Sequence, residues 1–126
     1  MSKLDDALES AAKFNQARGW DAVPQDLAKS VVIESAELLE LFQWDSSDRN
    51  LGSNPKPKDI DKVKSEIADV LWYLSSLCRS MNIDLADALF SKIKYQEEKY
   101  PAEMFNGKHN DEFYKQRKAE YRQNRK

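Results

Sequence analysis

Four carboxylates occur in this sequence as two equally spaced pairs, and the spacing suits metal chemistry. The first pair is Glu34 and Glu37, and the second is Glu66 and Asp69. Residues three apart lie on the same face of an α-helix, so each pair presents two carboxylates to one side. Facing one another across a helical bundle, the pairs would make a site of four hard oxygen ligands, which suits Mg²⁺ or Mn²⁺. The absence of His or Cys nearby argues against zinc.

Both acidic pairs border positions that a helix would fill with apolar residues. On a helical wheel of about 100° per residue, Glu34 falls at the edge of an apolar arc, with Glu37 one row beyond it. Glu66 falls inside the apolar stripe of its own segment, with Asp69 at the margin. A half-buried carboxylate is costly unless it is paired or binds a metal. The positions therefore favour a functional site, whereas Glu40 lies on the polar side and is interpreted as solvated.

Long helical segments must position these acids. Apolar residues recur at helical spacing in four segments, and only 3 Gly and 4 Pro interrupt the chain. The predicted helices span residues 4–18, 25–44, 60–81 and 85–100. Asp59 and Asp84 are expected to cap the last two, and residues 45–58, rich in Ser, Asn, Gly and Pro, are predicted to form a loop. The expected fold is all-α, an antiparallel four-helix bundle.

The composition is that of a small globular protein with a highly charged surface. The 126 residues are 40% hydrophobic and 33% charged, with a formal net charge of −2. We expect residues 1–110 to form one domain and residues 111–126, with six Lys or Arg against three acids, to form a basic helical tail. No apolar stretch approaches the roughly 20 residues that span a bilayer. We therefore expect a cytoplasmic protein that binds neither a membrane nor a nucleic acid polymer.

The motifs around the acids resemble a known enzyme family. Residues 34–44 read ESAELLELFQW and residues 66–73 read EIADVLWY, with Lys92 ahead of Tyr100 and Pro101. These motifs resemble the MazG-like all-α nucleotide pyrophosphohydrolases, and most closely the branch that includes the dCTP pyrophosphatases. The resemblance covers most of the chain and leaves the basic tail unexplained.

The resemblance implies a site for both a metal and a nucleoside triphosphate. It implies that the four acids bind Mg²⁺, with Mn²⁺ as a substitute, and that Trp20, Trp44 and Tyr73 surround the base. Aromatic faces stack on nucleobases, which fits this assignment. Lys92 corresponds to a family lysine near the phosphates, and Gln96 corresponds to a family asparagine on the fourth helix. The family also implies self-association, as a homodimer or a homotetramer.

The implied reaction is the hydrolysis of a (d)NTP to the (d)NMP and diphosphate. dCTP or a related or modified dNTP would be the substrate, in a role of nucleotide-pool house-cleaning. Such chemistry needs charge neutralisation and geometry more than covalent catalysis, and Glu34 or Glu37 would orient or deprotonate the attacking water. The double acid of many MazG proteins is Ile33-Glu34 here, and a nucleotide-contacting histidine of some relatives corresponds to Ala11. These departures bear on base and sugar selectivity rather than on the metal.

Two other functions stay open. A phosphoribosyl-ATP pyrophosphohydrolase of histidine synthesis shares the four-helix logic, although the run Phe42-Gln43-Trp44 disfavours it. The alternative from another class is a non-catalytic helical adaptor, whose acids are surface charge and whose basic tail binds a partner. A nucleophilic Ser, Cys or His site does not compete, since the single histidine, His109, is predicted to lie at the surface.

Overall fold

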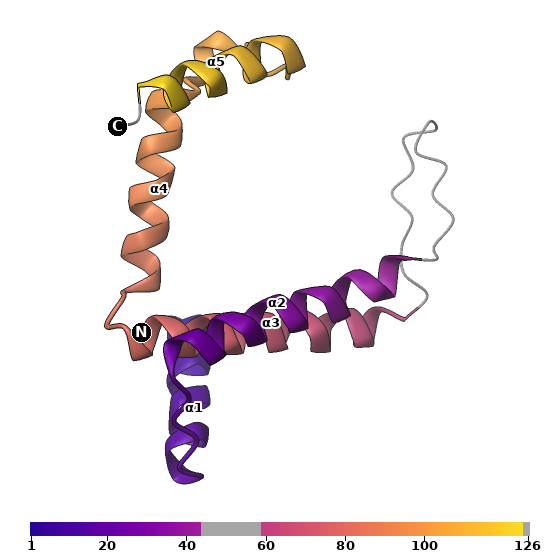
Figure 1. Ribbon diagram of the computed structural model, residues 1–126, viewed down its shortest axis with the longest axis vertical. Coiled ribbons are helices and arrows are strands. Elements are labelled where there is room, and N and C mark those ends of the chain that lie inside the picture. Colours follow the sequence, from indigo (N-terminus) through magenta and orange to yellow (C-terminus); the bar gives the residue numbers. More distant parts are fainter. Residues whose placement is uncertain (44–58, 125–126) are drawn as a thin grey trace. The chain divides into compact units, whose positions relative to one another are not determined.

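The computed structural model describes residues 1–43 and 59–124, and all regular structure in these ranges is helical (Figure 1). The elements are α1 (Lys3–Ala17), α2 (Pro24–Gln43), α3 (Ile60–Ser80), α4 (Leu85–Lys99), a short 3-10 turn η2 (Ala102–Met104) and α5 (Asp111–Gln123). The all-α prediction is confirmed, and each predicted helix lies close to its expected bounds. The predicted loop at residues 45–58 and Trp44 lie outside the described residues.

The chain divides into two compact units, Met1–Ile83 and Asp84–Lys126. The first unit holds α1, α2 and α3, and the second holds α4, η2 and α5. The assembly of four helices into one bundle therefore stays a prediction, as does a domain boundary after residue 110. None of the described helices combines the length and the apolar character that crossing a bilayer requires.

α2 and α3 form an antiparallel pair that makes most of the contacts of the first unit (Figure 1). On α2 the less exposed positions recur at spacings of three and four residues, as expected for a helix that packs along one stripe, whereas on α3 they also form an unbroken run from Asp69 to Cys78. The stripe comprises Leu27, Val31, Glu34, Leu38 and Leu41 on α2, and Val63, Glu66, Val70, Tyr73 and Leu77 on α3. Only Leu27 and Val63 are fully buried among the described residues. Each stripe also contains one acid, so packing brings Glu34 and Glu66 to the same interface.

Side-chain caps fix where the last two predicted helices begin. The Asp59 carboxylate accepts the backbone N–H groups of Asp61 and Lys62 at 3.1 and 3.2 Å. The Asp84 carboxylate accepts the N–H of Asp87 at 2.9 Å. Each cap satisfies a donor that has no partner inside its helix and stabilises the helix by about 1 kcal/mol. Both caps confirm the sequence prediction.

α1 lies against the C-terminal half of α3. The Asn15 amide donates to the Ser76 hydroxyl at 3.3 Å, and Arg79 pairs with Glu9 at 3.0 Å. That ion pair is about half exposed, so we assign it less than about 1 kcal/mol. Together the contacts hold α1 beside the C-terminal half of α3.

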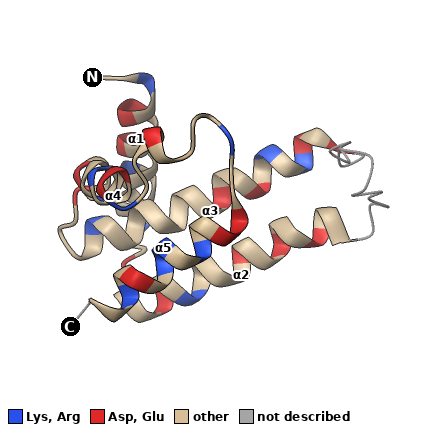
Figure 2. Cartoon of the chain, turned by 90° about the horizontal axis from the view of Figure 1, so that it is seen from above, with Lys and Arg blue, Asp and Glu red and all other residues tan. Residues whose placement is uncertain are grey.

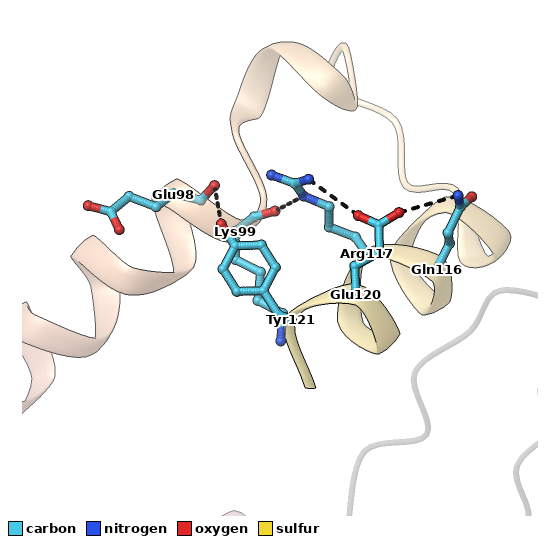
Figure 3. Close-up of polar contacts among 6 residues, drawn as sticks. All are labelled: Glu98, Lys99, Gln116, Arg117, Glu120 and Tyr121. Atoms are coloured by element: carbon cyan, nitrogen blue, oxygen red, sulfur yellow. Dashed lines mark hydrogen bonds and ion pairs between the residues drawn. The ribbon is translucent and has the colours of Figure 1, made fainter. Parts of the chain in front are cut away.

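In the second unit, side chains of α5 donate hydrogen bonds to the last carbonyl groups of α4 (Figure 3). Arg117 Nε donates to the Lys99 carbonyl at 2.7 Å, and the Tyr121 hydroxyl donates to the Glu98 carbonyl at 3.2 Å. Arg117 also pairs with Glu120 at 3.5 Å. Carbonyls at a helix C-terminus have no intrahelical partner, so these bonds stabilise the junction. The predicted helical tail is thus a helix that contacts its neighbour.

Candidate active site

Three of the four predicted acids converge between α2 and α3. Glu34 and Glu37 on α2 and Glu66 on α3 each offer one carboxylate oxygen, and these oxygens lie within 4.8 Å of one another. Figure 2 shows acidic stretches in red on both helices. The convergence follows from the packing stripe, because Glu34 and Glu66 lie in it and Glu37 is almost one turn beyond Glu34. Asp69 lies outside this group of three, almost one turn beyond Glu66.

Two of these acids carry buried oxygen atoms that no donor satisfies. Glu34 and Glu66 are half-buried, and the Oε2 atom of each is buried without a hydrogen-bond partner. Leaving a carboxylate oxygen desolvated and unpaired is unfavourable. Because the two acids come from facing helices and each has an oxygen in the group of three, a cation bound there would offset both charges.

The closeness of the acids raises two carboxylate pKa values. A hydrogen bond with the Glu37 side chain, followed by loss of solvation and by nearby negative charges, raises the pKa of Glu34 from 4.5 to about 7. Loss of solvation and then the charges of Glu37 and Asp69 raise the pKa of Glu66. Asp69 also contributes to the raised pKa of Glu34. The cluster therefore favours either bound protons or a compensating cation.

The donor set fits a hard divalent cation. The group consists of carboxylates only, and Mg²⁺ prefers oxygen ligands and is commonly bound by one or two carboxylates together with substrate phosphates. Mn²⁺ accepts the same ligands. Glu34, Glu37 and Glu66 can hold such an ion, and Asp69 lies near enough to act on the same charges.

Two of the predicted base-binding aromatics lie in the first unit. Tyr73 is half-buried on α3, about one turn beyond Asp69, and so lies on the acid-bearing side of that helix. Trp20 lies in the segment between α1 and α2 and is 61% exposed. The third, Trp44, lies outside the described residues.

Lys92 and Gln96 lie on α4, in the second unit. They are four residues apart and both exposed, so they share one face of the helix. The Lys92 ammonium lies 5.3 Å from the Tyr95 ring centroid. Their place in the site stays a prediction.

The structure adds Phe14, which the sequence did not indicate as a site residue. Phe14 contacts both Trp20 and Trp72 through ring edges. The sequence feature that could have indicated Phe14 is its position as an aromatic residue in the last turn of a helix that Gly19 ends. Glu40 is exposed as predicted, yet its charge contributes to the raised pKa of Glu66.

Sequence comparisons relate this chain to nucleotide pyrophosphatases. Residues 29–115 match the model of the MazG-like family, a range that includes all four acids. dCTP pyrophosphatase 1 from Mus musculus is 33% identical over 106 residues, which make up 82% of this chain and 62% of that protein. The protein of the same name from Homo sapiens is 32% identical over 103 residues, or 80% of this chain and 61% of that protein. The chain thus spans less than two thirds of the length of these curated relatives.

A structural comparison agrees with the sequence comparisons. The crystal structure of a pyrophosphatase from Archaeoglobus fulgidus matches the fold with a TM-score of 0.69 and 36% sequence identity. The match covers 80% of this chain and 94% of that chain.

Proposed function

Because this chain belongs to the MazG-like family, we propose that it is a Mg²⁺-dependent nucleoside triphosphate pyrophosphohydrolase. It converts a (d)NTP and water into the (d)NMP and diphosphate. The observation that carries the proposal is the convergence of Glu34, Glu37 and Glu66 within 4.8 Å. A cluster of acids with buried, unpartnered oxygens suits the charge-neutralising catalysis that a triphosphate requires.

Glu34, Glu37, Glu66 and Asp69 hold the cation in this proposal. A bound Mg²⁺ supplies positive charge to the phosphate oxygens and lowers the pKa of a water. The acids themselves fix where that charge lies relative to the substrate. Asp69, outside the group of three, is proposed as the fourth ligand.

Glu34 or Glu37 orients the attacking water and accepts its proton. The water oxygen forms a bond to the α-phosphorus, the bond from the α-phosphorus to the bridging oxygen breaks, and diphosphate leaves. Glu34 is one candidate, since it is half-buried in the packing stripe and carries a buried carboxylate oxygen without a hydrogen-bond partner. Glu37, exposed and adjacent, is the other candidate.

The nucleoside is recognised by aromatic stacking in this proposal. Trp20, Trp44 and Tyr73 enclose the base, where each stacking contact is worth roughly 1 to 3 kcal/mol. Lys92 binds the phosphates, and Gln96 contacts the nucleotide. dCTP and related or modified deoxynucleotides are the first candidates, since the curated relatives are named dCTP pyrophosphatases. A substrate from the nucleotide pool fits a house-cleaning role in the cytoplasm.

A panel of triphosphates tests the proposal. Diphosphate release is measured from the four common dNTPs, methylated dCTP and phosphoribosyl-ATP, each with Mg²⁺, with Mn²⁺ and with a chelator. We expect cation-dependent release with a preference for dCTP or its modified forms. A preference for phosphoribosyl-ATP would support the histidine-synthesis enzyme, and no release from any substrate by folded protein would support the adaptor.

We further propose that the protein is a homodimer or homotetramer whose neighbouring chains complete each active site. The support is the large apolar exposure of the first unit, where Val32, Leu39 and Ile67 are 69%, 67% and 51% exposed. Apolar surface of this kind is typical of interfaces. Sedimentation velocity at micromolar protein measures the state, and activity per chain should fall where dilution dissociates it. A stable monomer with full activity would refute this assembly.

A further inference from the structure

The C-terminal end of α1 is a tight turn that fixes the backbone of Trp20. The Gly19 N–H donates to the Gln16 carbonyl at 3.1 Å, and the Trp20 N–H donates to the Asn15 carbonyl at 3.0 Å. Gly19 has a φ of 63°, the left-handed conformation that glycine adopts without strain. This pair of bonds is the Schellman motif, which ends a helix and sets the direction of the next residue.

The Trp20 side chain is held by an aromatic contact rather than by burial. Trp20 is 61% exposed as a residue, and its ring centroid lies 5.7 Å from that of Phe14 in an edge arrangement. Phe14 makes a second edge contact, at 5.3 Å, with Trp72 of α3. Edge-to-face pairs at these distances are directional and attractive. Phe14 therefore connects an exposed indole to the helix that carries Glu66.

Arg18 fixes the Phe14 ring from a third direction. Its guanidinium carbon lies 3.4 Å from the ring centroid, and its Nη1 donates to the Phe14 carbonyl at 3.0 Å. A guanidinium over a ring face is attracted by the electrons of the ring. The Phe14 ring therefore contacts the indoles of Trp20 and Trp72 and the guanidinium of Arg18.

We propose that Phe14 is a positioning residue that holds Trp20 as one wall of the nucleoside pocket. The inference rests on the proposed function, since it takes Trp20 to stack on the base. Through Phe14, the indole is tied to Trp72 and hence to α3, so the base and the phosphates are held by one connected structure. A preordered indole loses less conformational entropy when a base stacks on it.

Kinetics of Phe14 variants test this role. Phe14→Leu keeps an apolar side chain but removes both ring contacts, and we expect it to raise KM by about threefold to tenfold with kcat changed less than about twofold. Phe14→Tyr keeps the ring and should restore KM. Phe14→Leu combined with Trp20→Leu should be no worse than Trp20→Leu alone, because the two residues act as one unit. An unchanged KM in Phe14→Leu, or additive losses in the double variant, would overturn the role.

An NMR measurement keeps the inference separate from the proposed function. The indole N–H resonance of Trp20, assigned with Trp20→Phe, should shift in Phe14→Leu and return in Phe14→Tyr. Phe90→Leu, at a position on α4 that is 69% exposed, is the matched control and should leave it in place. If the wild-type protein hydrolysed no triphosphate, the proposed function would fall and the nucleoside role with it. The resonance of Trp20 would still decide whether Phe14 holds the indole.

Discussion

Two charged regions of this chain use their polar atoms in opposite ways. At the junction of α4 and α5, a donor meets an acceptor, as where Arg117 binds the Lys99 carbonyl at 2.7 Å. Between α2 and α3, like charges meet, and Glu34 and Glu66 each keep a buried oxygen without a partner. Folding alone gains nothing from gathering acids, so satisfied contacts mark structure and an unsatisfied acidic cluster marks a site.

The largest effect should come from removing one charge of the acidic cluster. We expect Glu37→Gln or Asp69→Asn to lower hydrolysis by on the order of a hundredfold or more, because the cation loses a ligand. Helical content, measured by circular dichroism, should stay intact because the acids serve the metal and not the core. Glu103→Gln removes an exposed charge elsewhere and is the control. Full activity in either cluster variant would sink the site assignment.

A smaller effect is expected on KM, and it should differ between Tyr73 near the acidic cluster and Tyr121 at the α4–α5 junction. Tyr73→Ala, beside the acids, should raise KM by about tenfold and lower kcat less, since a lost stacking contact weakens binding of the base. Trp44→Ala should behave likewise. Tyr121→Ala, at the junction, should leave KM unchanged because its hydroxyl donates to the Glu98 carbonyl and its ring packs on Tyr95 within the second unit. If Trp44→Ala kept the same KM for every dNTP, Trp44 would be assigned to the core.

The helices and the acidic pairs could be predicted from the sequence because their determinants are local. Asp59 and Asp84 accept N–H groups two and three residues further along the chain. The pairing of Glu34 with Glu37 follows in the same way from the period of a helix. Such contacts need no knowledge of the rest of the fold.

The contacts between helices could not be predicted in this way. Arg117 binds the Lys99 carbonyl, 18 residues earlier in the chain. The segment between them turns the chain back through Asn106 and Gly107, which have positive φ values of 47° and 72°. The raised pKa of Glu66 likewise depends on how α2 rotates against α3, which the packing of many side chains decides. The sequence predicted a basic helical tail. It did not predict that the tail contacts α4, because the bond from Arg117 to the Lys99 carbonyl joins residues far apart in the sequence.

The junction should respond in stability and not in activity. Arg117→Met removes the bond to the Lys99 carbonyl, and we expect it to destabilise the second unit by about 1 kcal/mol, measured by urea unfolding. Hydrolysis should change less than about twofold. Lys115→Met, at an exposed position of the same helix, is the control. If Arg117→Met inactivated the protein as strongly as the cluster variants, the contrast between the two regions would be wrong.

The smallest effect should be a pH dependence of stability that only the acidic cluster produces. The pKa of Glu34 is raised from 4.5 to about 7 and that of Glu66 is raised as well, so the folded protein binds these protons more tightly than the unfolded chain. This contribution to stability is complete below the unfolded pKa and is lost as pH rises through the folded pKa. Without metal, the thermal unfolding midpoint of the wild type minus that of Glu34→Gln should therefore decrease as the pH rises from about 5 to about 8. Mg²⁺ should raise the wild-type midpoint most at the upper end, because the ionised acids bind it best. If this midpoint difference stayed constant or increased with pH, the carboxylates of the cluster would not repel one another in the folded protein. The acidic cluster would then not differ from the α4–α5 junction in this respect.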